Sequence, residues 1–294
     1  MSKAKFDRSE EDIGNIVVLE HVNTRVADQQ LAVTFYLMGL GLTRDPYLMA
    51  GTGNMWINVG RAQFHLPTHK ESQVLTGHTG LVIPHRAALL ERLASVKEAL
   101  AGTKFSFAEH NDYVEVTCPW GNKIRCFEPS ERFGAMRLGM PYVEIDAPVG
   151  TAKGIARFYK KILGTHAEAG TDGGDAIATV QAGDGQLLIY REKAGKRPAY
   201  DGHHIAIYLA DFSGPYKKLL KKGMVSEESD QHQYRFLDIF DPNDDKVLLR
   251  IEHEVRSMRH PMYARPLVNR EPRMNNRNYV PGYESSDFAM EPSL

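Results

Sequence analysis

Cysteine is scarce in this chain, and long apolar runs are missing. Only Cys118 and Cys126 occur among 294 residues, and they flank one expected hairpin. They match no zinc-binding spacing and imply no disulfide framework. No apolar run approaches the ~20 residues that a membrane-spanning helix needs. The N-terminal segment, MSKAKFDRSEEDIGN, is too polar and charged for a secretory signal. We therefore expect a reduced, cytoplasmic protein with no membrane partner.

An excess of charge of either sign is also missing. The chain has 36 basic and 37 acidic residues, which gives a net charge of −1. Nucleic-acid-binding proteins need a positive electrostatic footprint, so no nucleic-acid partner is expected. Hydrophobic residues make up 42% and charged residues 25%, as in ordinary globular proteins. The length is enough for two domains, each with its own core.

The chain does contain an internal repeat. Four stretches each begin with an apolar strand that carries one polar residue, followed by a turn, an amphipathic helix and three short strand-like runs. The polar residue of the four stretches is, in order, His21, His78, Glu144 and His204. A Phe-Tyr pair follows at the same distance in the first and third stretches, at Phe35-Tyr36 and Phe158-Tyr159. Such a repeat indicates one structural module used four times.

Each module has the order βαβββ, which gives an α+β fold. Such a unit cannot bury both faces of its sheet alone, so the modules must pair into curved mixed sheets that enclose cavities. We expect modules one and two to form an N-terminal domain over residues 1–130, and modules three and four a C-terminal domain over residues 139–254. Residues 255–294 are rich in Arg, Asn, Pro and Tyr, lack a period, and are expected to form an extended arm.

Repeated βαβββ modules with a His on the first strand resemble the vicinal oxygen chelate superfamily, which includes glyoxalase I and the extradiol ring-cleaving dioxygenases. The resemblance covers residues from about 16 to 252. It implies two glyoxalase-like domains, with a metal at the mouth of each cavity held by the first and last strands of the paired modules. The same fold serves lyases, isomerases, oxygenases and plain binding proteins, so the resemblance does not choose the reaction.

For the first cavity, the resemblance places His21 and His78 on first strands and His65 on the last strand of module one. Three such ligands suit Fe²⁺, Mn²⁺, Ni²⁺ or Zn²⁺ and leave positions open for substrate. Where relatives carry a glutamate, this chain has Arg125, which cannot ligate a metal. Glu128 completes the ligand set only if a bulge shifts the strand register.

The role of Arg125 is open between two interpretations. It either clamps the carboxylate or phosphate of a substrate, or pairs with a nearby acid such as Glu115.

For the second cavity, the resemblance places Glu144 and His204 on first strands, while the last-strand positions fall on Leu188 and Leu248. Glu252 shares a strand face with Leu248 and is a further candidate. The set Glu144, His204 and Glu252 is not the pattern of the ring-cleaving dioxygenases. This pattern predicts a degenerate or structural second cavity, and His204 alone is interpreted as a structural histidine.

One alternative concerns the pairing of modules. Some relatives pair non-adjacent modules or swap modules between subunits, which would place His21 and His65 with His204 instead of His78.

The leading hypothesis is a divalent-metal enzyme of the oxygen-chelate type. It acts on a small, oxygenated, anionic organic substrate by lyase, isomerase or dioxygenase chemistry. The rival hypothesis is a non-catalytic small-molecule binding or sequestering protein with degenerate metal sites. The sequence assigns no catalytic acid or base beyond Glu128 as a candidate, and a homodimer is left open.

Overall fold

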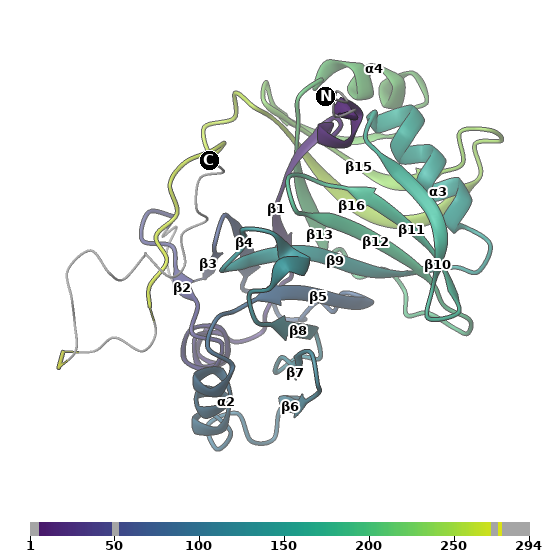
Figure 1. Ribbon diagram of the computed structural model, residues 1–294. Coiled ribbons are helices and arrows are strands. Elements are labelled where there is room, and N and C mark those ends of the chain that lie inside the picture. The colour runs from purple at the N-terminus through teal and green to yellow at the C-terminus, as the bar shows by residue number, and fades with distance from the viewer. Residues whose placement is uncertain (1–5, 49–52, 272–275, 278–294) are drawn as a thin grey trace, which may run out of the picture.

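The strands of this protein form two mixed eight-stranded sheets (Figure 1). The computed structural model describes residues 6–48, 53–271 and 276–277. The predicted α+β fold of four βαβββ modules is confirmed, and the helices are short. Among the described residues, no helix is both long and apolar enough to cross a membrane.

The elements follow the repeat. Module one, after the short helix η1 (Arg8–Glu11), comprises β1 (Ile16–Asn23), α1 (Gln29–Ala32), its π-helical continuation η2 (Val33–Gly39), β2 (Thr43–Arg44), β3 (Asn54–Val59) and β4 (Ala62–Pro67). Module two comprises β5 (Gly77–Val82), α2 (Arg86–Ser95), β6 (Ser106–Glu109), β7 (Val114–Thr117) and β8 (Lys123–Phe127).

The second half repeats this order after the short helix η3 (Glu131–Phe133). Module three comprises β9 (Gly139–Ala147), α3 (Ala152–Phe158), its continuation η4 (Tyr159–Leu163), β10 (Ala167–Asp172), β11 (Asp175–Gln181) and β12 (Leu187–Glu192). Module four comprises β13 (His204–Leu209), α4 (Ser213–Lys221), β14 (Val225–Asp230), β15 (Gln233–Phe240) and β16 (Val247–Ser257).

An aspartate lies at the start of two of these helices. The Asp28 carboxylate accepts hydrogen bonds from the backbone N–H groups of Gln30 and Leu31, at 2.7 and 3.1 Å. The Asp211 carboxylate accepts from the backbone N–H of Gly214. Both contacts satisfy donors that the first turn of a helix leaves free.

The modules pair in an order different from the predicted one. Sheet A has the order β14-β15-β16-β13-β1-β4-β3-β2 and joins modules one and four. Sheet B has the order β10-β11-β12-β9-β5-β8-β7-β6 and joins modules two and three. In each sheet the first strands of two modules run antiparallel, β1 against β13 and β5 against β9. The expected sharing of a sheet by modules one and two, and by three and four, is therefore wrong, and the pairing of non-adjacent modules is confirmed.

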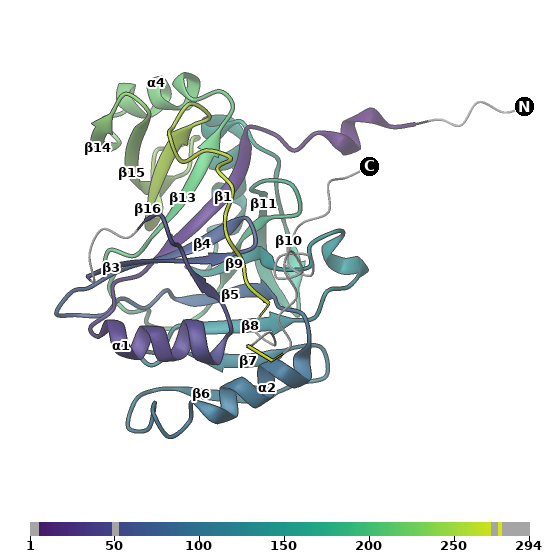
Figure 2. The same ribbon diagram turned by 90° about the vertical axis from the view of Figure 1, so that its left-hand side faces the viewer.

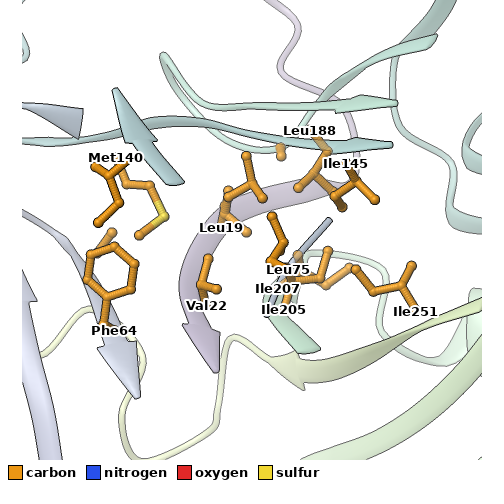
Figure 3. Close-up of a cluster of buried hydrophobic side chains, with 14 of the residues drawn as sticks. Leu19, Val22, Phe64, Leu75, Met140, Ile145, Leu188, Ile205, Ile207 and Ile251 are labelled. Carbon is orange, nitrogen blue, oxygen red and sulfur yellow. The ribbon is translucent and has the colours of Figure 1, made fainter. Parts of the chain in front are cut away.

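The apolar core connects the two sheets. Figure 3 shows Leu19 of β1 and Ile205 and Ile207 of β13 beside Ile145 of β9 and Leu188 of β12, and all five are buried. Helix α3 contacts β10, β11 and β12 of sheet B and also β15 of sheet A. Because modules one and two lie in different sheets, and so do modules three and four, residues 1–130 and 139–254 each contribute strands to both sheets. Whether those boundaries mark units that fold alone stays a prediction.

The C-terminal arm begins later than expected, because β16 continues to Ser257. The described part of the arm, residues 258–271, runs back over module one (yellow in Figure 2). Most of the remaining predicted arm lies outside the described residues.

Candidate metal centre

The site on sheet A begins with an irregularity in β1. The pairing of β1 with β13 shifts between Leu19 and His21, so Glu20 has no partner of its own. Bulges of this kind redirect side chains. Glu20 and His21 are both buried, and the Nδ1 of His21 lies 2.9 Å from the Glu20 carboxylate. This contact orients the His21 ring and leaves its Nε2 directed elsewhere.

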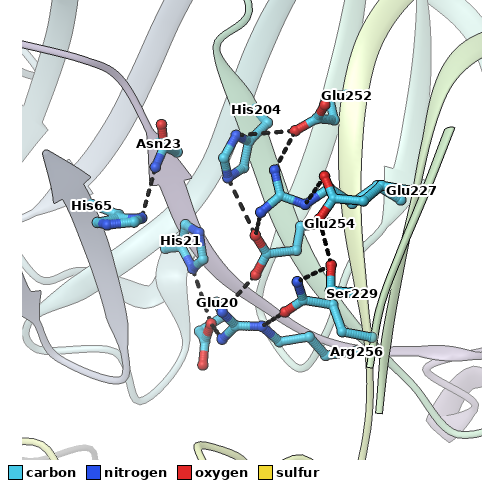
Figure 4. Close-up of polar contacts among 12 residues, drawn as sticks. Glu20, His21, Asn23, His65, His204, Glu227, Ser229, Glu252, Glu254 and Arg256 are labelled. Carbon is cyan, nitrogen blue, oxygen red and sulfur yellow. Dashed lines mark hydrogen bonds and ion pairs between the residues drawn. The ribbon is translucent and has the colours of Figure 1, made fainter. Parts of the chain in front are cut away.

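A second histidine approaches from module four. His204 begins β13 and pairs in register with Glu252 of β16, while Glu254 pairs with Ala206 two residues further on. The Nδ1 of His204 lies 3.4 Å from Glu252, and its Nε2 lies 3.4 Å from Glu254. The Nδ1 of each histidine therefore lies beside a carboxylate, Glu20 or Glu252, and Figure 4 shows the two rings near Glu254.

His21, His204 and Glu254 each offer one potential ligand atom within 4.8 Å of the others, and all three are buried. Among the described residues, neither the Nε2 of His21 nor the Nε2 of His204 has a hydrogen-bond partner. A buried polar nitrogen without a partner is costly, because it has lost its bonds to water. Two imidazoles and one carboxylate at such spacing are suitable ligands for a divalent transition metal. The residues present therefore fit a metal ion.

Charges around Glu254 keep it ionised. Arg235 donates to one carboxylate oxygen at 2.6 Å, and Arg256 lies 2.5 Å from the other. Burial raises the pKa of Glu254, but His204, His21 and Arg256 outweigh it and hold the pKa well below its usual range. A carboxylate that stays charged at neutral pH can bind a cation.

Arg256 also supports Glu20. It donates to the Glu20 carboxylate, which in turn accepts a hydrogen bond of 2.7 Å from the hydroxyl of Tyr208. Burial acts to raise the pKa of Glu20, yet His21 and Arg256 hold it below its usual value. Burial and Glu20 raise the pKa of Tyr208, so its hydroxyl stays protonated and donates.

His65, a predicted ligand, lies near the centre, but its ring nitrogens are used elsewhere. Its Nδ1 lies 2.6 Å from the amide of Asn23, and its Nε2 lies 2.6 Å from the side chain of Asn54. The ring stacks on Trp56 and lies 5.6 Å from the His21 ring. Burial, with His21 and His204 nearby, lowers the pKa of His65 to about 2, so it is neutral. It is better suited to lining the centre than to ligating a metal.

His78, the other predicted ligand, lies on β5 in sheet B. Its Nε2 is 3.0 Å from the hydroxyl of Tyr142, and its Nδ1 is 3.6 Å from Glu144. Burial lowers the pKa of His78 to about 4, although Glu144 acts in the opposite direction. The structure thus places His78 and Glu144 together, and not with His21.

The two sheets use equivalent positions differently. Glu254 pairs with the second residue after His204, and in the same way Arg191 pairs with Asp146, the second residue after Glu144. Sheet B therefore has an arginine where sheet A has its carboxylate. Arg191 donates to both oxygens of Glu144, at 2.9 and 3.0 Å. A guanidinium cannot ligate a metal, so this cluster is an ion-pair network.

Of the remaining predicted residues, Arg125 and Glu128 lie away from the centre on sheet A, whereas Glu252 lies beside it. Arg125 on β8 lines a cavity on sheet B that His78 and Glu144 also line. Its Nε lies 3.6 Å from Glu115, and its guanidinium lies over the ring of Tyr113. Glu128 is exposed and accepts a hydrogen bond from the backbone N–H of Arg86, where α2 begins. A ligand or base role for Glu128 would require a different orientation. Glu252 faces the Nδ1 of His204 and pairs with Arg235 at 2.6 Å.

Sequence reasoning missed Glu254, Glu20 and Arg256. The last-strand position of module four was predicted at Leu248, six residues before Glu254, and Glu252 was the last residue of this strand considered as a ligand. The segment Glu252-His253-Glu254-Val255-Arg256 places a charged residue at every second position. That period of two predicts a continuing strand with one charged face, and this signal would have identified Glu254.

Comparisons with known proteins identify the fold. No family model matches the sequence, and neither does any curated protein. Maize (Zea mays) glyoxalase I shares 12% identity over 82% of this chain and 92% of its own, with a TM-score of 0.54. A point mutant of the same maize enzyme gives 14% identity over the same shares and a TM-score of 0.56.

A provisionally assigned dioxygenase of Bacillus subtilis subsp. subtilis strain 168 shares 14% identity over 83% of this chain and 86% of its own, with a TM-score of 0.55. Identities this low establish the fold alone. The similarity extends over both halves of the chain, and so confirms the resemblance first seen in its repeats. This protein has the fold of the vicinal oxygen chelate superfamily.

Proposed function

We propose that this protein is a divalent-metal enzyme of the oxygen-chelate type, with His21, His204 and Glu254 as the metal ligands. The observation that carries the proposal is the convergence of these three buried side chains within 4.8 Å, with two histidine nitrogens lacking any other described partner. A metal ion bound there would supply Lewis-acid chemistry toward neighbouring substrate oxygens and, as Fe²⁺, reaction with dioxygen.

Of the reactions that the fold serves, we favour a dioxygenase. Two histidines and one carboxylate form the ligand set typical of non-heme Fe²⁺ oxygenases. The chain's own residues hold this set in place. Glu20 fixes His21, Glu252 faces His204, and Arg235 and Arg256 position Glu254. A small oxygenated organic anion is the proposed substrate class, because the half-buried guanidinium of Arg235 lies beside the ligands.

A non-catalytic binding protein is the second candidate function. The observation that favours it is that Arg235 and Arg256 already contact both oxygens of Glu254. Such contacts neutralise the carboxylate and weaken its attraction for a metal.

Elemental analysis of protein reconstituted anaerobically with Fe²⁺ separates the two. We expect about one metal ion per wild-type chain, and loss of metal in His21→Ala and His204→Ala. His78→Ala is the matched control and should keep its metal, because His78 lies in the other sheet. A wild-type protein that retains no metal, or equal loss in all three variants, would refute the enzyme proposal. Oxygen uptake with catechol then distinguishes dioxygenase from lyase or isomerase chemistry.

A further inference from the structure

A cavity of about 510 Å³ lies between the C-terminal arm and sheet A. On the sheet side it is lined by residues that include Glu20, Gln63 and Tyr208, and on the arm side by the segment 262–267. None of the three proposed metal ligands lines it. Glu20 separates the two sites, because its carboxylate contacts His21 and the residue also borders the cavity.

The arm is fixed over this cavity by specific bonds. Arg265 donates to Asp45, a fully buried carboxylate, at 2.6 Å. The amide of Asn58, also fully buried, donates to the backbone carbonyl of Val268 at 2.9 Å. Asn269 bonds to both the N–H and the carbonyl of Gly60. These contacts hold the arm in place as one wall of the cavity.

The uncompensated charge of this cavity is positive. Glu20 is paired with Arg256, and Arg265 is paired with Asp45. Arg61 stands in the turn between β3 and β4, is exposed, and lines the cavity. Within the described part of the chain, no hydrogen bond or ion pair is found for its guanidinium. A planar guanidinium without a partner is suited to a carboxylate.

The rest of the wall is apolar and aromatic. The rings of Tyr208 and Tyr263 lie 5.0 Å apart in an edge-to-face arrangement. Met262, Pro266 and Leu267 add apolar surface. Aromatic rings favour offset or edge contacts of this kind, both with one another and with a bound ring. The wall therefore accommodates a flat apolar body.

We propose that the cavity under the arm binds a small aromatic carboxylate. The ring lies against Tyr263 and the apolar arm residues, and the carboxylate pairs with Arg61. This site goes beyond the proposed function, since its contacts require no metal.

Titration with 4-fluorobenzoate, followed by ¹⁹F NMR, tests the site. We expect wild-type protein to bind 4-fluorobenzoate at least ~10-fold more tightly than the neutral 4-fluorobenzamide, because a charge-assisted pair is lost. Arg61→Gln should weaken benzoate binding by a similar factor and leave benzamide binding unchanged. Tyr263→Ala should weaken the binding of both compounds. Lys217→Gln, which removes the same charge from the exposed face of α4, is the matched control and should bind as wild type does.

His204→Ala separates this site from the metal centre. Benzoate binding that persists in this variant supports the site under the arm, even if the protein proves to bind no metal. Binding that disappears with His204 would place the carboxylate on the metal and overturn the inference. Absence of benzoate binding to wild type, or equal binding to Arg61→Gln, would also overturn it.

Discussion

At the residue scale, each histidine of the centre on sheet A has its Nδ1 beside a carboxylate that orients the ring. The Nδ1 of His21 is 2.9 Å from Glu20, and the Nδ1 of His204 is 3.4 Å from Glu252. Carboxylates in this position fix the ring of a metal-binding histidine and increase its basicity. The centre therefore includes residues that support the proposed ligands without being ligands themselves, and substitutions there test it without removing a metal-binding group.

Glu20→Gln is expected to weaken metal binding by roughly 10- to 100-fold, the range usual for partners of ligating histidines. The neutral amide no longer balances Arg256 and holds His21 less firmly. Competition with a chelator measures the affinity, and Glu168→Gln, at an exposed site on β10, is the control. An affinity equal to that of wild type would show that Glu20 has no part in orienting His21.

His78 predicts a dependence of stability on pH. Its pKa in the folded protein is lowered to about 4 by burial, against an ordinary value of 6.5. Glu144, Arg125, Arg191 and Tyr142 surround it. Below pH 6.5 the unfolded chain takes up a proton that the folded chain resists, so stability falls as the pH is lowered toward 4.

This loss should amount to roughly 2 kcal/mol between about pH 7.5 and about pH 4.5 for His78 alone. Urea unfolding at the two pH values measures it. The neutral substitution His78→Gln should lose about that much less stability on acidification than wild type. Equal losses in the two proteins would contradict the effect.

At the element scale, strand ends proved harder to predict than strand starts. The first strands, with His21, His78, Glu144 and His204, were located from the repeat because each module begins with the same buried pattern. The end of β16 was missed, since alternating charges resemble a solvated segment when their ion-pair partners are unknown. The bulge at Glu20 has no local signal, because it depends on how β1 meets β13.

The attachment of the C-terminal arm can be tested by changing one side chain, that of Asp45. Asp45 is fully buried and bonds to Arg265, and its pKa, which burial raises, is held below the usual value by that arginine. Asp45→Asn should destabilise the fold by about 1–3 kcal/mol, because a buried charged partner is lost. Urea unfolding of the two proteins measures the difference.

The same change should release the arm, so that trypsin cleaves at Arg259 and Arg265 faster than in wild type. Asp244→Asn, in an exposed turn, is the control. Unchanged cleavage in Asp45→Asn would mean that other contacts hold the arm.

At the scale of the whole molecule, module pairing decides which residues share a site. The sequence predicts four modules but cannot choose their partners, because every first strand offers an equivalent apolar edge. Neighbours in sequence are the usual partners, and that expectation put His78 beside His21. Tertiary packing instead joins modules one and four, which brings His204 and Glu254 to His21.

This pairing predicts that neither half of the chain folds alone. Residues 1–138 lack the β13 partner of β1, and residues 139–294 lack the β5 partner of β9. Each half expressed separately should show no cooperative thermal unfolding by circular dichroism, whereas the two halves mixed should regain it. Cooperative unfolding of an isolated half would instead support the sequence-based division into two domains.

Anomalous diffraction from crystals of Fe²⁺-reconstituted protein, recorded at the iron edge, tests the central claim most directly. The proposed ligand set predicts one strong peak, about 2.0–2.2 Å from the Nε2 of His21, the Nε2 of His204 and a carboxylate oxygen of Glu254. A peak beside His78 and Glu144, or no peak within reach of the three ligands, would contradict it.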